Sequence, residues 1–380
     1  AVGASAVRAG AVADARAAAL QAANATTALD EVTAAPPSAN DAVAGRGPGA
    51  PLRPRHGGAG WGTPRFALVN GSIETLWQRP AGELKGLFFI AHGCMHQAPD
   101  VFSGSAPDGT VSEACARTHF GRCLDLPEEA RLRDAALARG YLVVAVSGGS
   151  GKQSCWMASD LPRIVVALRY VREAEGLPED APLLASGASS GGAMVGLLAT
   201  PAGPPHLRCI VPQVSNTDAL TWGNDGRKVP TLFVHMPRDG YTADMVEDDF
   251  LALQGAGIRT AQIKVLPRAV TAKFLGPCLG AGLGKEVVAA LHKSGTVDKD
   301  GFLTQDARER KWVEPVRGVM QGRSNDSLKA DESCIAELMN VAWAFHEFTA
   351  QFAEDMLDFC EEKGRFAPEA VSTTPPLQSR

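Results

Sequence analysis

Two absences limit the classes of protein to which this chain can belong. No apolar run approaches the roughly 20 residues that a membrane-spanning helix needs. The net charge is −5, without an excess of basic residues, so neither a nucleic acid nor an anionic membrane surface is expected as a partner. With 380 residues, of which 45% are hydrophobic, the chain is long enough for one large α/β domain or two small ones.

Motifs for several other chemistries are missing or incomplete. None of the eight cysteines is part of a C-x-x-C pair, which argues against zinc or thioredoxin-type sites. The segment 148–152 is similar to a phosphate-binding loop, but Val146 and Gln153 stand where glycine and Ser/Thr are required. The sequence begins at Ala1 without a methionine or an apolar secretion signal, so we expect a leader segment to be absent already.

Cysteine spacing and asparagine context favour an oxidising route. Cys115 and Cys123 bracket a short loop, which suits a local disulfide, although eight reduced thiols are the alternative. Asn24, Asn70 and Asn325 each begin an N-x-S/T acceptor sequence for N-glycosylation. Together these features favour the secretory pathway or the extracellular space over a plastid or the cytosol.

Composition divides the chain into three parts. Residues 1–60 are rich first in alanine and then in glycine, proline and arginine, which predicts a disordered extension. Residues 61–364 alternate apolar runs with helical patterns and are expected to form one domain. This domain includes a helical insert at about 275–330, and a polar tail follows over 365–380.

Within that domain the apolar runs predict strands of a mostly parallel sheet. Leu87–Ala91 and Tyr141–Ser147 are continuous apolar runs, typical of strands that are buried on both faces. Strands alternating with helices imply helices on both faces of the sheet, and hence an α/β fold. The helical insert follows the last strand, and a helical segment over 331–362 is expected to close the domain. Further strands are expected in or at 66–76, 183–186, 209–214, 230–236 and 261–266, and helices at 127–139, 160–175 and 242–253.

The most informative motif is Gly187–Gly191, which has the sequence Gly-Ala-Ser-Ser-Gly. It follows a short apolar run and precedes a helix rich in small residues, which is the arrangement of a nucleophile elbow. Such an elbow raises a serine hydroxyl above the edge of the sheet, beside a helix N-terminus that favours negative charge. Ser189 is the expected nucleophile because glycine lies two residues away on each side; Ser190 is the alternative.

A hydrolytic serine needs a base and an acidic residue that orients the base. Asp239 follows the predicted strand 230–236 and is the candidate acid, with Asp244 as the second choice; Asp239 could instead only cap the next helix. Only His292 and His346 lie later in the chain, and His346 is preferred as the base because of its late position. His346 lies within a helical pattern, however, so the alternative is a histidine that packs in the core or against another helix.

The oxyanion of the reaction requires backbone N–H donors. One is expected from Ser190, and a second from Cys94 or Met95 in the loop after the strand that ends in His92-Gly93. His92, Cys94 and His96 also look like a crowded metal site. No outlying ligand completes the set, so we expect neither a metal nor another cofactor.

These motifs together resemble the α/β-hydrolase superfamily. More narrowly, the chain is similar to poorly characterised plant and algal α/β-hydrolases over about residues 60–362. The elbow is also similar to that of polyhydroxybutyrate-depolymerase-like and feruloyl-esterase-like enzymes. The segments that show the narrower resemblance are His92–His96, Cys123–Glu129, Asp298–Arg308 and Asn340–Glu347.

The resemblance and the motifs predict a serine hydrolase. Ser189 would attack a small or polymer-derived carboxylic ester, His346 would transfer the proton, and Asp239 would orient the imidazole. An acyl-enzyme would then be hydrolysed by water. A catalytically inactive member that keeps the fold as a binding module is the main alternative, and acyl transfer to an alcohol is a third possibility.

Overall fold

The structure is a computed structural model that describes residues 61–105, 110–148, 153–217, 227–324 and 326–366. All of these belong to one compact unit, residues 50–380. The predicted disordered extension over residues 1–60 lies outside the described residues, as does nearly all of the predicted tail. No helix in the described part of the chain has the length and apolar character needed to cross a bilayer.

The centre of the fold is one eight-stranded sheet with the order β1-β2-β4-β3-β5-β6-β7-β8. β2 pairs with β1 and β4 in the antiparallel sense, and all the other neighbours are parallel. The strands are β1 (Arg65–Val69), β2 (Ile73–Gln78), β3 (Gly86–Ala91), β4 (Tyr141–Val146), β5 (Leu183–Ala188), β6 (Leu207–Gln213), β7 (Thr231–His235) and β8 (Thr260–Lys264).

The central strands are buried on both faces because their side chains alternate between two hydrophobic cores. In β3, Leu87 and Phe89 belong to one core, whereas Phe88 and Ile90 belong to the other. This two-residue period is the expected consequence of strand geometry, and it explains why the run is apolar throughout. Each core therefore needs its own cover of helices.

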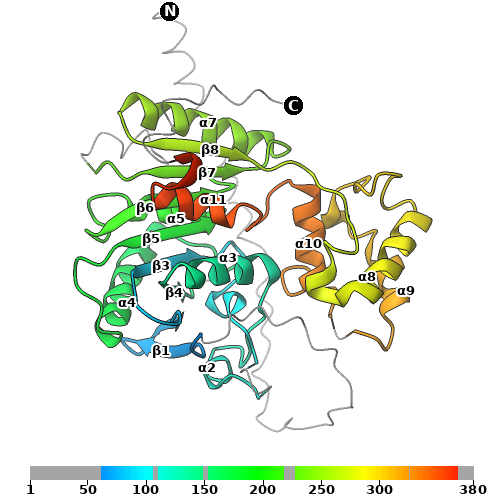
Figure 1. The fold of residues 1–380 in the computed structure, drawn as a ribbon, viewed down its shortest axis with the longest axis horizontal. Helices are drawn as coiled ribbons and strands as arrows, with labels where there is room; N and C mark the ends of the chain where they lie inside the picture. Colours follow the sequence, from blue (N-terminus) through cyan, green and yellow to red (C-terminus); the bar gives the residue numbers. More distant parts are fainter. Residues whose placement is uncertain (1–60, 106–109, 149–152, 218–226, 325, 367–380) are drawn as a thin grey trace, which may run out of the picture. The chain divides into compact units, whose positions relative to one another are not determined.

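Helices cover both faces of the sheet (Figure 1). α4, α5 and α7 contribute to one core, and α3 and α11 contribute to the other. The strand order and the two helical layers confirm the predicted α/β-hydrolase fold. The helices are α2 (Glu113–Ala116), α3 (Pro127–Ala138), α4 (Leu161–Ala174), α5 (Ser190–Leu198), α7 (Gly240–Gly255), α8 (Gly276–Lys293), α9 (Val313–Met320), α10 (Cys334–Trp343) and α11 (Ala353–Cys360).

A third hydrophobic core lies away from the sheet. It is formed by residues from Val270 to Ala342, including those of α8, α9 and α10, and we call residues 270–343 the helical subdomain. In Figure 1 these yellow and orange helices gather on one side of the sheet. The helical subdomain thus follows β8, and it extends beyond residue 330 because α10 packs in the same core.

The segment 331–362 is not the single helical segment that the sequence predicts. α10 ends at Trp343, and Ala344 follows with a left-handed backbone (φ 53°). Ala344 is fully buried and belongs to a core of the sheet, whereas Ala342 belongs to the core of the helical subdomain. The chain must therefore turn between two cores at this point, and tertiary packing overrides the helical pattern. Residues 345–352 form a loop before α11.

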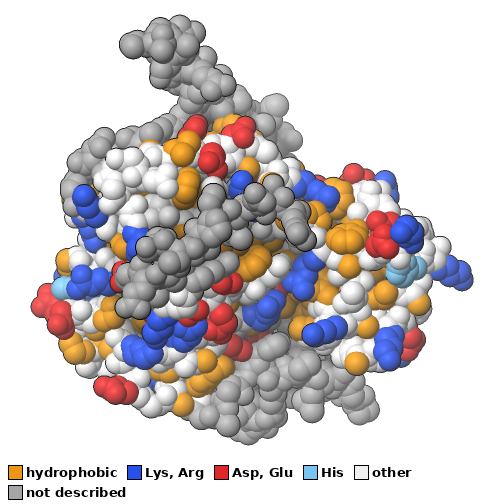
Figure 2. Space-filling view, turned by 45° about the horizontal axis from the view of Figure 1, so that its top comes forward, with side chains coloured by type: hydrophobic (Ala, Val, Ile, Leu, Met, Phe, Trp, Pro, Cys, Tyr) orange, Lys and Arg blue, Asp and Glu red, His pale blue; other side chains and the backbone are white. Residues whose placement is uncertain are grey.

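All eight cysteines are paired in disulfides. The predicted Cys115–Cys123 bridge is present, and the other pairs are Cys94–Cys155, Cys209–Cys360 and Cys278–Cys334. On the face drawn in Figure 2, basic and acidic side chains of the described residues are interspersed. This mixture is consistent with the small net charge of the whole chain.

Candidate active site

The Gly187–Gly191 motif forms a sharp turn between β5 and α5. Ser189 has φ 54° and ψ −121°, a backbone conformation that a non-glycine residue rarely adopts. Both motif glycines are required by the close approach of β3. A Cβ on Gly191 would lie 2.3 Å from the Ala91 oxygen, and one on Gly187 would lie 2.7 Å from the same oxygen. The strand, turn and helix thus have the geometry of a nucleophile elbow.

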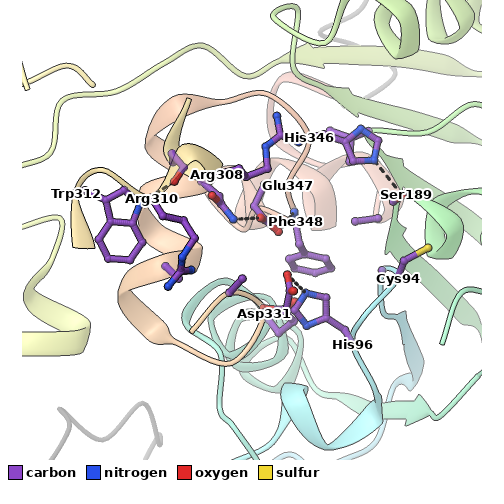
Figure 3. Close-up of a pocket in the computed structure, with 18 residues that line it drawn as sticks. Cys94, His96, Ser189, Arg308, Arg310, Trp312, Asp331, His346, Glu347 and Phe348 are labelled. Carbon is purple, nitrogen blue, oxygen red and sulfur yellow. Dashed lines mark hydrogen bonds and ion pairs between the residues drawn. The ribbon is translucent and has the colours of Figure 1, made fainter. Parts of the chain in front are cut away.

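The three sequence-predicted triad side chains meet at this elbow. His346 Nε2 lies 2.9 Å from Ser189 Oγ, and His346 Nδ1 lies 2.6 Å from Asp239 Oδ2. Figure 3 shows the His346 ring directed at Ser189 from the loop after α10. Asp239 belongs to the turn that follows β7, so the three residues come from three distant parts of the chain.

Asp239 both caps a helix and contacts His346. Its Oδ1 accepts a hydrogen bond from the Thr242 N–H at the start of α7, while Oδ2 faces His346. Burial opposes ionisation of this carboxyl, but the hydrogen bonds from Thr242 and His346 outweigh burial and lower the pKa of Asp239. The carboxylate is therefore ionised at neutral pH. One side chain therefore both caps α7 and contacts the histidine.

Two buried polar residues hold the loop that contains His346. Gln213, at the end of β6, accepts the Ser189 N–H with its backbone oxygen (3.0 Å) and the Thr349 N–H with its side-chain oxygen (3.0 Å). Glu128 at the start of α3 accepts hydrogen bonds from the Thr349 hydroxyl and the Ala350 N–H. Sequence reasoning missed both residues. The available signal was a polar residue that ends an otherwise apolar strand.

Two of the residues expected to supply oxyanion donors, Ser190 and Cys94, lie beside Ser189. Ser190 is the first residue of α5, so its N–H precedes the hydrogen-bonded part of the helix. Cys94 lines the same cavity as Ser189, and its N–H has no acceptor among the described residues. The Met95 N–H is instead donated to the Gln153 oxygen at 2.6 Å. Of the two expected donors after β3, Cys94 is therefore the one whose N–H meets no acceptor in the part of the chain that the structure describes.

His92 supports the structure of the loop after β3. Its Nδ1 donates to the Gly93 oxygen (2.7 Å) and its Nε2 accepts the Gly148 N–H (3.0 Å), while Trp156 stacks on the ring. Burial lowers the pKa of His92 to about 4, so the ring is neutral and has both nitrogens engaged. No group of three or more His, Cys, Asp or Glu side chains in the described residues is arranged to hold a metal ion.

A cavity of about 290 Å³ opens beside Ser189, between the sheet and the helical subdomain. Figure 3 shows Trp312 and Arg310 on the side of the helical subdomain, opposite Ser189, with His96 and Asp331 facing each other below. Charged and amide side chains contribute much of the lining: His96, Glu129, Arg308, Arg310, Asp331, Asn340 and Glu347.

Buried acidic groups and one imidazolium surround the floor of this cavity. Burial raises the pKa of Glu129 to about 7, and it raises the pKa of Glu337 and of Glu347 as well. Although burial opposes its charge, the hydrogen bond to Asp100 raises the pKa of His96 to about 10. Oε2 of Glu129 and Oε2 of Glu337 are buried without a hydrogen-bond donor among the described residues, so a proton bound by one carboxyl group can be shared with the other.

This carboxyl pair predicts a pH-dependent stability. The pKa of Glu129 in the folded state lies above the ordinary value of 4.5 for a glutamate side chain. The folded state therefore binds more protons between about pH 4.5 and 7, and the free energy of unfolding falls as pH rises through this range. His96, with its raised pKa, acts in the same direction above pH 6.5. Glu337→Gln supplies an N–H donor without a bound proton. We therefore expect the fall in Tm from pH 5 to pH 8 to be about 2–4 °C smaller in this variant.

The measurement is thermal unfolding at several pH values, with Glu314→Gln on the exposed side of α9 as the matched control. An identical Tm decline in wild type and Glu337→Gln would contradict the shared proton.

The other sequence candidates lie apart from the site. His292 is exposed near the end of α8, and Asp244 is exposed on α7, so neither takes the place of His346 or Asp239. Asn70 is exposed in the turn between β1 and β2, with φ 50°. Asn24 and Asn325 lie outside the described residues.

Comparisons with known proteins add only distant similarities. No family model and no curated protein matches the chain. Solved structures similar to it include an acylaminoacyl peptidase in complex with Z-Gly-Gly-Phe-chloromethyl ketone (13% identity, TM-score 0.37), a dienelactone hydrolase from Anabaena variabilis (16%, 0.36) and an arylesterase (15%, 0.35). The matches cover 50%, 55% and 59% of this chain and 34%, 88% and 79% of those chains. The chain thus spans about a third of the peptidase, and its α/β-hydrolase fold is assigned from its own strand order and elbow.

Proposed function

We propose that the protein is a serine hydrolase that cleaves carboxylic esters through an acyl-enzyme. Ser189 attacks the carbonyl carbon, and His346 Nε2 accepts its proton and returns it to the leaving alcohol. Asp239 keeps the Nδ1 proton of His346 in place and stabilises the imidazolium. Water then attacks the acyl-enzyme with His346 again as base, so the ester yields an acid and an alcohol.

The observation that supports this proposal is the hydrogen-bonded series Ser189–His346–Asp239 at the ends of β5 and β7. A positive φ at a non-glycine residue costs about 1–3 kcal/mol and persists only where the surrounding structure enforces it. Folding alone does not require a serine at the strained position 189. The strain therefore favours an enzyme over a binding module.

The tetrahedral intermediate would be stabilised by two backbone donors. We assign these to Ser190 N–H, at the N-terminus of α5, and to Cys94 N–H in the loop after β3. Met95 is the weaker candidate because its N–H already donates to Gln153.

Several finer assignments belong to the same proposal. Esters are preferred to amides because ester cleavage is the commoner reaction among α/β-hydrolases, and the substrate is a small or polymer-derived ester. The relation to plant and algal hydrolases and to polyhydroxybutyrate-depolymerase-like or feruloyl-esterase-like enzymes rests on the sequence motifs. Four disulfides and the exposed Asn70 sequon support a location in the secretory pathway or outside the cell.

A fluorophosphonate probe tests the proposal directly, because it phosphonylates an activated serine. We expect stoichiometric labelling of the folded wild type, mapped by peptide mass spectrometry to Ser189 and lost in Ser189→Ala. A label on Ser190 instead of Ser189 would identify Ser190 as the nucleophile. Folded wild type without any label would support the inactive binding module instead. Product analysis with an added alcohol distinguishes hydrolysis from acyl transfer.

A further inference from the structure

The Cys94–Cys155 disulfide joins the loop after β3 to the loop after β4, 61 residues later in the sequence. Cys94 lines the cavity that contains Ser189, and it is the only cysteine among the described residues that does so. Its Sγ lies 3.4 Å from the Ser190 hydroxyl oxygen. The bridge therefore contacts the residue directly after the nucleophile.

The same hydroxyl links both halves of the bridge. Ser190 Oγ accepts a hydrogen bond from the Trp156 N–H at 3.3 Å, and Trp156 follows Cys155 in the chain. The indole N–H of Trp156 in turn donates to the His92 oxygen at 2.9 Å. The Ser190 hydroxyl at the start of α5 thus contacts Cys94 directly, and it contacts the chain next to Cys155 through the Trp156 N–H.

The backbone on both sides of the bridge is strained. Met95, which follows Cys94, has φ 70°, and Ser154, which precedes Cys155, has φ 52°. Each left-handed non-glycine residue costs about 1–3 kcal/mol and persists only when its surroundings hold it. The covalent bridge and the Met95 N–H to Gln153 hydrogen bond join the two loops directly beside these strained residues.

We propose that the Cys94–Cys155 disulfide is a positioning element that holds the Cys94 N–H at the oxyanion site of Ser189. This inference rests on the proposed hydrolase function. Without the bridge, Met95 and Ser154 can relax to negative φ values, and the Cys94 N–H moves with them. The contacts of Ser189 with His346 come from other elements and are retained.

The test compares two double variants. In Cys94→Ala/Cys155→Ala, we expect kcat for 4-nitrophenyl acetate to fall about 10- to 100-fold, because a displaced oxyanion donor costs up to about 100-fold in rate. KM should stay within about threefold, since the donor acts on the transition state rather than on substrate binding. The pH profile of kcat/KM should keep its shape because His346 and Asp239 are intact.

Cys115→Ala/Cys123→Ala is the matched control, since it removes a disulfide outside the cavity, and it should keep wild-type kcat. The Tm of the wild type and of both double variants shows whether each protein is folded at the assay temperature, so that a lower kcat can be assigned to the rate and not to unfolding. If the first double variant does not fold, Ser190→Ala serves instead: it keeps the bridge and removes its hydroxyl contact, with an expected fall of about three- to tenfold in kcat.

The outcomes separate the two proposals. Wild-type kcat in folded Cys94→Ala/Cys155→Ala, or a fall equal to that of the control, would overturn the positioning role and leave the hydrolase intact. A wild type that neither labels with fluorophosphonate nor cleaves the ester would overturn both.

Discussion

Replacing His346 with alanine should lower kcat for 4-nitrophenyl acetate by roughly 10⁶-fold, the order of loss found when the base of a serine triad is removed. His346 Nε2 is the only ring nitrogen within hydrogen-bond distance of Ser189 Oγ in the described residues, so no neighbour can replace it. The measurement is steady-state kinetics on protein of verified fold, together with the rate of fluorophosphonate labelling. Both rates should fall together, because both need an activated Ser189.

His292→Ala is the control for this experiment. His292 is the other histidine that follows Asp239 in the sequence, and it is exposed on α8. Its substitution should change kcat by less than about twofold, as for a surface residue away from the chemistry. A large loss in His292→Ala, or a near-normal kcat in His346→Ala, would reject the assigned base.

Asp239→Asn should separate the two contacts of this side chain. Asparagine still accepts the Thr242 N–H and caps α7, so the free energy of unfolding should change by less than about 0.5 kcal/mol. The amide would, however, donate to His346 Nδ1 and thereby place the remaining proton on Nε2, facing Ser189. In that tautomer His346 cannot accept the serine proton, and we expect kcat to fall about 10⁴-fold.

The Asp239→Asn experiment combines kinetics with denaturant unfolding. Asp244→Asn is the matched control, because Asp244 is exposed on the same helix and should affect neither quantity. A loss of stability without a loss of rate would show that Asp239 serves only as a helix cap.

Local patterns explain why much of the fold was predictable. The continuous apolar runs of β3 and β4 predict that both faces of these strands are buried. The elbow depends on glycine positions that are only a few residues apart. The Cys115–Cys123 bridge is also local, since the two cysteines are only 8 residues apart in the sequence. Each of these features is determined by neighbouring residues and by backbone sterics.

The remaining features depend on contacts that a single sequence does not reveal. Ala344 leaves the helix because two hydrophobic cores meet there, so the helical pattern around His346 was misleading. Gln213 contacts Thr349 from 136 residues away, and Cys94 pairs with Cys155 across the sheet edge. Such long-range pairs are products of the tertiary fold.

The end of α10 at Trp343 has a further consequence. The nucleophile is attached to the cores of the sheet, whereas the base is reached through a helix of the separate core formed by α8, α9 and α10. Arg238 joins the two, since it stacks on the Trp343 ring and donates to the Trp343 oxygen. The helical subdomain therefore helps to position the catalytic base. A shortened protein without this subdomain would still display the serine, and Gln213 and Glu128 would still contact the loop at Thr349 and Ala350. It would, however, lose the attachment at Trp343, on the other side of His346.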